Sequence, residues 1–253
     1  MYTRKATTAG LWLRLGGDPG QRPRRRLICM PHAGGTASTY GTWPGLLPQD
    51  LAVYTAQYPG RQDRFREPPA DSIEDMAESI ASALEPFSGD PLVVFGHSMG
   101  AYVAYEVVVE LERRHGPVVD LLVVSGVIAP HRKGAGEVHK LGDAEFVAEV
   151  ARDNESFADL LVNPDLIEVL LPMIRDDYRL FELYRPSDPP AVHARMLATG
   201  GRTDPDVDHD GLVSWGELAT GDFEAVTFPG GHFYLVEDEA ALVGALAERL
   251  RSV

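Results

Sequence analysis

The chain has a single cysteine and few basic residues, and each shortage excludes certain bonds or binding partners. Because Cys29 has no second cysteine to pair with, an internal disulfide is excluded, which is typical of a protein kept in a reducing compartment. Lysine and arginine number 23 against 38 aspartates and glutamates, so the formal net charge is −15. This balance argues against nonspecific binding to nucleic acid, and an anionic membrane surface would repel the chain.

Long apolar runs are also missing. Residues 1–10 lack the apolar core of a signal peptide, and no run approaches the ~18 consecutive apolar residues that span a membrane. We therefore expect a cytoplasmic location. With 253 residues, of which 44% are hydrophobic and 24% charged, the chain is long enough for a full core. No repeat or low-complexity linker divides it, so we expect residues 1–253 to form a single domain.

Short apolar segments alternate along the chain with segments of helical spacing. Apolar residues at helical spacing predict amphipathic helices over 72–84 and 237–250. Strands that are apolar throughout and alternate with helices indicate a mostly parallel sheet covered on both faces, so the predicted class is α/β. The strands we expect lie at 26–30, 51–56, 92–95, 120–126, 192–199 and 223–228.

Residues 130–190 break this alternation. A polar, glycine-containing stretch at 131–140 precedes three predicted helices, at 143–152, 164–171 and 172–183. They are too long for one crossover connection, so we expect a helical insertion over the C-terminal edge of the sheet. Insertions at this place often act as lids that gate a pocket. An extra layer of helices that does not move is the alternative.

The segment 96–100, Gly-His-Ser-Met-Gly, follows a predicted strand and precedes a predicted helix. It fits the pattern G-x-S-x-G, in which a tight turn between strand and helix exposes a serine hydroxyl. The glycines are needed because the turn brings backbone segments too close for a Cβ atom. Ser98 is therefore the predicted nucleophile, and a serine that merely caps the helix is the plainer alternative.

Two further polar residues follow predicted strands, Asp204 and His232. The chain order Ser98, Asp204, His232 is the one that α/β-hydrolases use. Histidine can take the serine proton near neutral pH and return it to the leaving group, while a buried carboxylate fixes the imidazole tautomer. Asp204 is the favoured acid because it lies closest to the strand end, although aspartates at 206, 208 and 210 crowd the same stretch.

The oxyanion hole of such enzymes is built from backbone N–H groups. One belongs to the residue after the nucleophile, here Met99, and the other to a loop after an earlier strand. The glycine-rich turn 31–35, Pro-His-Ala-Gly-Gly, fits that loop, with Ala33 as the expected donor. A plain glycine turn is the alternative.

One motif competes with this interpretation. Residues 206–217 satisfy the calcium-loop pattern D-x-[DN]-x-[DN]-G-x5-E. A working EF-hand needs a helix on each side, whereas a strand and a Gly/Pro turn precede this stretch. We therefore expect a solvated acidic loop rather than a calcium site.

Taken together, the motifs resemble those of the type II, or editing, thioesterases of polyketide and nonribosomal peptide synthesis. The resemblance runs from Leu27 to Leu235, and its motifs are Pro-His-Ala-Gly-Gly at 31–35, Tyr-Pro-Gly-Arg at 58–61, Gly-His-Ser-Met-Gly-Ala at 96–101, Leu-Pro-Met-Ile-Arg-Asp-Asp at 171–177, Asp-Pro at 204–205 and Gly-Gly-His-Phe at 230–233. It implies an α/β-hydrolase fold and a triad of Ser98, His232 and Asp204. It also implies Ala33 and Met99 as oxyanion donors, and hydrolysis of stalled or misprimed acyl groups on the 4′-phosphopantetheine arm of acyl or peptidyl carrier proteins. Such enzymes need no metal and no dissociable cofactor.

Carrier domains are usually acidic, as this chain is, so bulk attraction would not drive docking. Local basic segments such as 22–26 and 61–66, together with apolar contacts, would have to supply docking. Taken alone, the run at 22–26 abuts an apolar strand and is more typical of a solvated strand entry. Because the chain begins at Met1 with no carrier-like segment before it, we expect a free-standing enzyme, with a monomer as the default. The alternatives are a chain-releasing thioesterase, a small-molecule carboxylesterase on the same fold and, outside enzymes, a carrier-binding scaffold.

Overall fold

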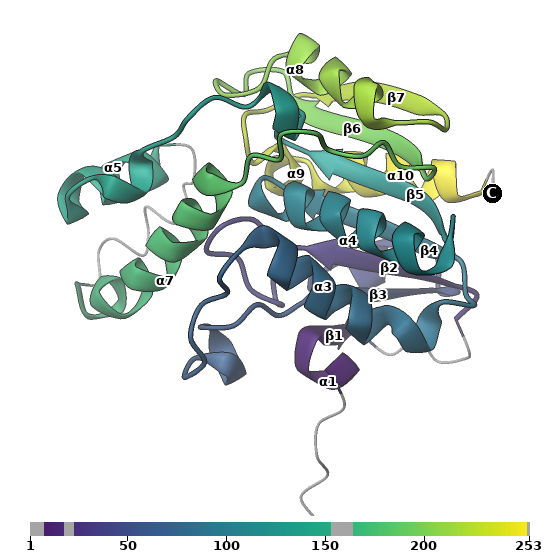
Figure 1. Cartoon of the computed structure of the whole chain (residues 1–253), viewed down its shortest axis with the longest axis horizontal. Coiled ribbons are helices and arrows are strands. Elements are labelled where there is room, and N and C mark those ends of the chain that lie inside the picture. Colours follow the sequence, from purple (N-terminus) through teal and green to yellow (C-terminus); the bar gives the residue numbers. More distant parts are fainter. Residues whose placement is uncertain (1–7, 18–22, 153–163, 252–253) are drawn as a thin grey trace, which may run out of the picture.

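A seven-stranded sheet forms the centre of the computed structural model, which describes residues 8–17, 23–152 and 164–251 (Figure 1). The strand order is β1-β3-β2-β4-β5-β6-β7. Only β1 runs antiparallel, against β3, and the other pairs in the sheet are parallel, which confirms the predicted α/β class. The strands are β1 Leu13–Gly16, β2 Arg25–Met30, β3 Leu51–Ala56, β4 Leu92–His97, β5 Val119–Ser125, β6 Arg195–Gly201 and β7 Phe223–Phe228.

Helices cover both faces of this sheet. The α-helices are α1 Thr8–Trp12, α2 Trp43–Leu46, α3 Ile73–Leu84, α4 Met99–His115, α5 Asp143–Ala151, α7 Pro164–Leu183, α8 His209–Val213, α9 Tyr234–Glu237 and α10 Glu239–Arg251. Residues of α3 and α4 share one apolar cluster with one face of the sheet, and residues of α2 and α10 share another with the opposite face. The side chain of Ser72 caps α3 by accepting the N–H of Asp75, which fixes where that helix begins.

Successive strand residues point alternately into these two cores. In β2, Ile28 and Met30 belong to the cluster on the α3–α4 side, whereas Leu27 and Cys29 belong to the α2–α10 side, and all four are buried. A strand with two buried faces has no polar positions. This is why the central strands could be recognised as unbroken apolar runs.

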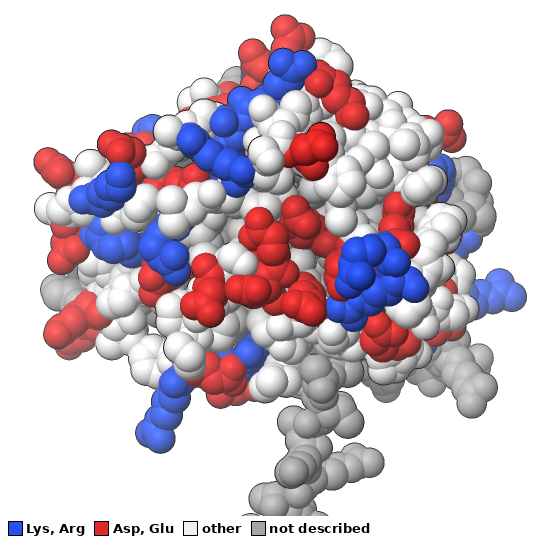
Figure 2. Space-filling model, viewed as in Figure 1, with Lys and Arg blue, Asp and Glu red and all other residues white. Residues whose placement is uncertain are grey.

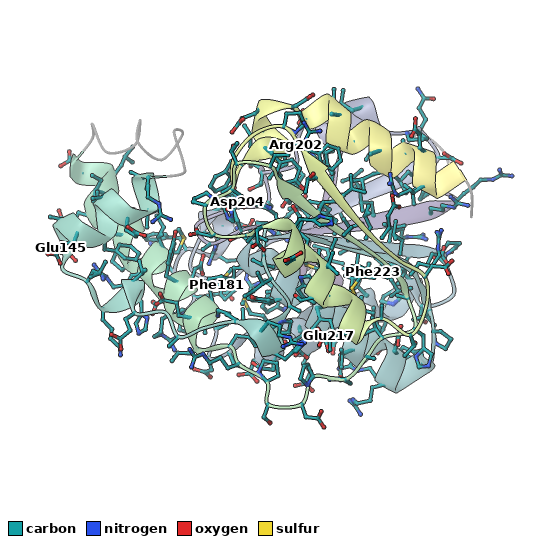
Figure 3. All side chains as sticks on the ribbon, turned by 90° about the horizontal axis from the view of Figure 1, so that it is seen from above. Glu145, Phe181, Arg202, Asp204, Glu217 and Phe223 are labelled. Carbon is teal, nitrogen blue, oxygen red and sulfur yellow. The ribbon has the colours of Figure 1, made fainter. Side chains whose placement is uncertain are left out.

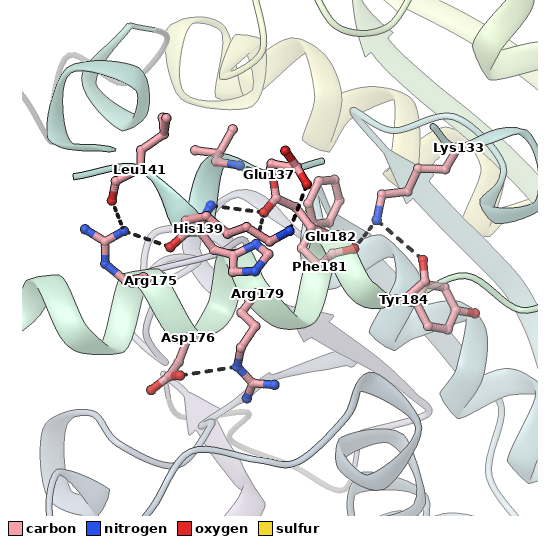
Figure 4. A network of polar contacts seen from close by, with 12 residues as sticks. Lys133, Glu137, His139, Leu141, Arg175, Asp176, Arg179, Phe181, Glu182 and Tyr184 are labelled. Carbon is pink, nitrogen blue, oxygen red and sulfur yellow. Dashed lines mark hydrogen bonds and ion pairs between the residues drawn. The ribbon is translucent and has the colours of Figure 1, made fainter. Parts of the chain in front are cut away.

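The insertion between β5 and β6 carries α5 and α7, which project from one end of the sheet (Figure 1). Among the described residues, its own apolar cluster has four buried members, Phe146, Val150, Leu171 and Ile174. Polar groups complete its packing (Figure 4). The carboxylate of Glu182 on α7 accepts the N–H groups of Val138 and His139 at 2.7 and 3.0 Å, and Arg175 donates to two carbonyls of the same segment.

One prediction about helices was wrong. Helices were expected at 164–171 and 172–183, but α7 runs unbroken with Pro172 inside it. An interior proline removes one N–H donor and clashes with the carbonyl four residues earlier, which kinks or breaks a helix, and here the helix continues. The helix expected at 237–250 is confirmed as α10, within two residues at each end, but α9, β1 and α8 were not foreseen.

Acidic side chains gather on one face of the molecule, over α3 and α4, with basic side chains beside them (Figure 2). Burial raises the pKa of Glu106 on α4, and the nearby carboxylates of Glu74 and Glu110 raise it further. Carboxylates on this face therefore lie close enough to repel one another. In the described part of the chain, none of the helices is both long and apolar enough to cross a membrane.

Candidate active site

The turn between β4 and α4 holds Ser98 in a strained conformation. Its φ and ψ are 55° and −124°, a region that residues with side chains rarely adopt. The N–H of Ser98 donates to the carbonyl of Ser125 on the neighbouring strand at 2.8 Å. A Cβ on Gly96 would collide with the Gly100 carbonyl, and one on Gly100 with the Met30 carbonyl. Close backbone packing therefore forces the serine outward at the sheet edge.

His232 and Asp204 form a hydrogen-bonded pair beyond the ends of β7 and β6. His232 Nδ1 lies 2.8 Å from Asp204 Oδ2, and the Asp204 side chain is fully buried. Its other oxygen accepts the N–H of Asp206 at 3.0 Å. Since the carboxylate accepts from Nδ1–H, Nε2 of the neutral ring is left as a proton acceptor. Figure 3 shows Asp204 at the edge of the sheet nearest to α5 and α7.

Ser98 and His232 line the same cavity, of about 460 Å³, at this edge. The structure records no hydrogen bond between these two residues, both of which it describes. Hydrogen bonds between a nucleophile and its base are often long without substrate and shorten when substrate binds. The assignment of Ser98, His232 and Asp204 as a triad therefore stays a prediction, with the carboxylate–imidazole half of the geometry in place.

The predicted oxyanion donors flank the nucleophile. Met99 is the first residue of α4, so its N–H has no acceptor within the helix. Ala33 lies in the turn after β2 and lines the cavity together with Ser98. Within the described ranges, no acceptor is recorded for the N–H of either residue. Both donors are thus available to an oxygen bound beside Ser98.

Two further histidines lie close to His232. His97 is buried, with its ring centroid 4.9 Å from that of His232, and the half-buried His32 has its ring centroid 6.1 Å from that of His97. Burial, followed by the charges of His232 and Arg61, lowers the pKa of His32 to about 4. Burial, followed by His232 and His32, lowers the pKa of His97 well below its usual range. Both rings are therefore neutral near pH 7, and His97 Nδ1 is 2.9 Å from Ser125 Oγ, so it faces the sheet interior.

Three carboxylates of the acidic stretch 206–217 bind other groups of the protein. Asp206 pairs with Arg152 at 3.2 Å, Asp208 caps α8 by accepting the Gly211 N–H, and Glu217 pairs with Arg132 at 2.7 Å. Among the residues that the structure describes, no three His, Cys, Asp or Glu side chains are grouped so that they could hold a metal ion. The geometry favours a structural loop over a calcium site.

In the basic segment 61–66, a predicted docking patch, Arg66 is exposed but the other two arginines are buried, so the surface there is less basic than the sequence suggests. Arg61 and Arg64 are each only 4% exposed. The Arg64 guanidinium lies 4.2 Å from the ring centre of Trp12 and pairs with Glu67. Of the other proposed segment, Arg22 lies outside the described residues. A run of arginines in a sequence does not distinguish a solvated patch from buried, hydrogen-bonded guanidinium groups.

The sequence also gave no role to Lys133, which lines the cavity from the inserted segment. Its Nζ donates to the carbonyls of Phe181 and Tyr184 on or near the end of α7 (Figure 4). Burial, followed by the charge of Arg185, lowers the pKa of Lys133 to about 8. No local pattern marked it, because its partners lie about fifty residues further along the chain.

Comparisons with known proteins point to one family. A family model described as a thioesterase domain matches residues 25–252. Thioesterase PikA5 of Streptomyces venezuelae is 35% identical over 96% of this chain and 86% of its own length. The structure of the type II thioesterase BorB from the borrelidin biosynthetic cluster covers 95% of this chain and 97% of its own, with 36% identity and a TM-score of 0.83. RedJ, a thioesterase from the prodiginine pathway in Streptomyces coelicolor, gives 37% identity, coverages of 91% and 92% and a TM-score of 0.84.

Proposed function

Since this chain belongs to the thioesterase family, we propose that it removes acyl groups held as thioesters on the 4′-phosphopantetheine arm of carrier proteins. It is an enzyme with the α/β-hydrolase fold that acts on thioesters, as predicted. The observation that carries the proposal is coverage. The similarity to a type II thioesterase extends over 95% of this chain and 97% of that one. Its biological setting is then polyketide or nonribosomal peptide synthesis, where it clears stalled or misprimed chains.

In the proposed mechanism, Ser98 Oγ attacks the thioester carbonyl while His232 Nε2 takes the hydroxyl proton. Asp204 stabilises the imidazolium that forms, and the N–H groups of Ala33 and Met99 donate to the carbonyl oxygen as it becomes negative. Collapse of the tetrahedral intermediate breaks the C–S bond, and the proton on His232 passes to the departing thiolate. A water molecule, deprotonated by His232, then attacks the acyl-enzyme and releases the carboxylic acid.

Substrate is proposed to reach Ser98 through two cavities. The cavity of about 460 Å³, which Tyr102 and Phe181 also line, is suited to the acyl chain. A second cavity of about 370 Å³ includes Ala33 and the exposed side chains of Phe65 and Val236, and is suited to the pantetheine arm. In this proposal the chain is one domain, and the insertion at about 130–190 serves as its lid.

The carrier is proposed to dock at the second cavity through apolar contacts. The acidic face over α3 and α4 disfavours an acidic partner (Figure 2). Exposed apolar side chains at this cavity, such as Phe65, which is 53% exposed, could bind the carrier without charge attraction. The proposal takes the enzyme to be a cytoplasmic monomer that binds its carriers weakly and transiently.

Hydrolysis rates on three substrates test this proposal. We would compare an acyl-loaded carrier protein, the same acyl group on free pantetheine and an aryl ester, each with wild type and Ser98→Ala. We expect the highest kcat/KM on the carrier thioester, and a loss of about 10⁴-fold or more in Ser98→Ala. A higher kcat/KM on the aryl ester with no gain from the carrier would identify a general esterase. Unchanged hydrolysis by Ser98→Ala would overturn the triad.

A further inference from the structure

A buried ion pair joins the insertion to the loop that precedes α3. Arg61 lies in the loop after β3, and Asp177 lies on α7. Arg61 Nη1 and Nη2 donate to Asp177 Oδ2 and Oδ1, both at 2.7 Å. The two side chains are only 5% and 3% exposed. This pairing is bidentate and almost without solvent, so it holds α7 at a defined distance from the loop.

The same two side chains also bind the predicted oxyanion loop. Asp177 Oδ2 accepts the N–H of Gly34 at 2.7 Å, and Arg61 Nη1 donates to the carbonyl of Gly35 at 3.0 Å. Gly34 and Gly35 directly follow Ala33, whose N–H is a predicted donor to the oxyanion. The backbone that carries this donor is therefore held from one side by an α7 carboxylate and its arginine partner.

Close packing reinforces the contact between this loop and α7. Gly34 has φ of +78°, and a Cβ there would lie 3.2 Å from Ile174, one turn before Asp177 on α7. From the other side, the Gln57 amide accepts the N–H of Ala37 at 2.9 Å and donates to the Arg61 carbonyl at 3.0 Å. The loop thus has few positions open to it while α7 stays in place.

We propose that Asp177 and Arg61 are positioning residues that set the Ala33 N–H for the oxyanion and couple its position to that of α7. The inference rests on the proposed function, because it takes Ala33 as an oxyanion donor. An oxyanion donor acts only if it is already aimed at the place where charge develops. If α7 moves away, the Gly34 N–H loses its acceptor and the loop is released. Hydrolysis is then confined to the state in which the insertion covers the site and excludes bulk water.

Stability alone does not account for this arrangement. A buried ion pair is often replaceable by apolar residues of similar volume without loss of stability. Apolar residues at 61 and 177, however, would leave the Gly34 N–H and the Gly35 carbonyl without these partners. The two charged side chains bind the backbone of the loop as well as each other, as expected of residues that position the loop.

The test separates transition-state effects from binding in purified full-length enzyme. We would measure kcat and KM on an aryl ester and an acyl-pantetheine thioester, together with inhibition by a trifluoromethyl ketone, whose adduct places an oxyanion in the hole. For Asp177→Asn and Arg61→Lys we expect kcat to fall about 10- to 100-fold with KM within about twofold, and ketone affinity to fall by a similar factor. The larger loss is expected for Arg61→Lys, because lysine cannot make the bidentate contact.

Asp143→Asn is the matched control. It removes the exposed Arg175–Asp143 pair, which also joins α7 to another segment at 2.7 Å but does not contact the oxyanion loop. We expect its kcat and ketone affinity to equal those of wild type. A rise in KM with kcat unchanged, an unchanged ketone affinity, or the same loss of kcat in Asp143→Asn would each overturn the inference.

The two proposals fail in different ways. If the carrier thioester is not preferred, the proposed function fails in the wild type, yet the aryl ester still reports on Asp177 and Arg61. If Asp177→Asn does not fold, Arg61→Lys retains the positive charge and gives the same comparison. Wild-type kcat and ketone affinity in Arg61→Lys would then contradict the coupling.

Discussion

The sheet edge and the helical insertion are built in opposite ways. The turn at Ser98 is fixed by backbone packed against backbone, with both faces of the sheet covered by large apolar clusters. The described part of the insertion buries only four residues in its own apolar cluster and relies on carboxylates, guanidinium groups and backbone amides. Rearranging the sheet edge would cost much of the core, whereas polar contacts exchange with water at a smaller cost. In the proposed function, the chemistry lies in the rigid part and control of access in the adaptable one.

The largest effect should come from the rigid part. Asp204→Asn removes the charge that orients His232, so we expect kcat for thioester hydrolysis to fall about 10³- to 10⁴-fold with little change in fold. Steady-state kinetics with circular dichroism would check both. Asp210→Asn, an exposed aspartate of the same stretch, serves as control and should keep wild-type kcat. Equal losses in the two variants would show that the wrong acid has been assigned.

The insertion should respond most strongly at its buried ion pair. Asp177→Ala leaves the Arg61 guanidinium buried without its partner, and we expect the free energy of unfolding to fall by about 3–5 kcal/mol. Asp143→Ala on the exposed pair should cost under about 1 kcal/mol. Urea denaturation of both variants measures the difference. Equal losses in the free energy of unfolding would show that the buried pair holds α7 no more strongly than the exposed pair.

The two neutral histidines make the sheet edge sensitive to acid. His32 has a pKa of about 4 in the folded protein, below its unfolded value, so the unfolded chain binds a proton first as the pH falls. Stability from this group is complete above about pH 6.5 and is lost between there and pH 4, a change of about 3 kcal/mol. Unfolding of wild type and His32→Gln at pH 7 and pH 4.5 should show a smaller loss in the variant. Parallel losses in the two proteins would contradict this assignment.

The smallest effect is expected in the acidic stretch. Asp208→Ala removes the cap of α8 and should cost about 1 kcal/mol of stability, with kcat unchanged. Thermal unfolding with added calcium or with EDTA gives the second readout. We expect neither to shift the midpoint. A rise with calcium that disappears in Asp208→Ala would restore the calcium-site interpretation.

The sheet was easier to predict from the sequence than the insertion and its contacts. Strands β3 and β7 were predicted with the observed bounds, and β2, β4 and β5 within two residues, because buried parallel strands leave a local apolar signal. The hydrogen bond between His232 and Asp204 was anticipated because both residues follow parallel strands, whose ends meet at one edge.

What escaped the sequence depends on distant partners. Arg61 and Asp177 are 116 residues apart, and nothing near either residue shows that it is buried and paired. The edge strand β1 has only four residues, and on one of its faces Leu13 is buried whereas Leu15 is exposed, so its apolar pattern is weak. The helix break expected at Pro172 did not occur because contacts of α7 with the rest of the protein outweigh the local preference.

The most direct test of the account is to trap the acyl-enzyme. Wild-type enzyme would be quenched in acid during turnover of an acyl thioester, digested and mapped by mass spectrometry, with Ser98→Ala treated in parallel. The account predicts one peptide, containing Ser98, that gains the mass of the acyl group, and no such gain in the variant. An acyl group on another residue, or turnover by Ser98→Ala at the wild-type rate, would contradict it.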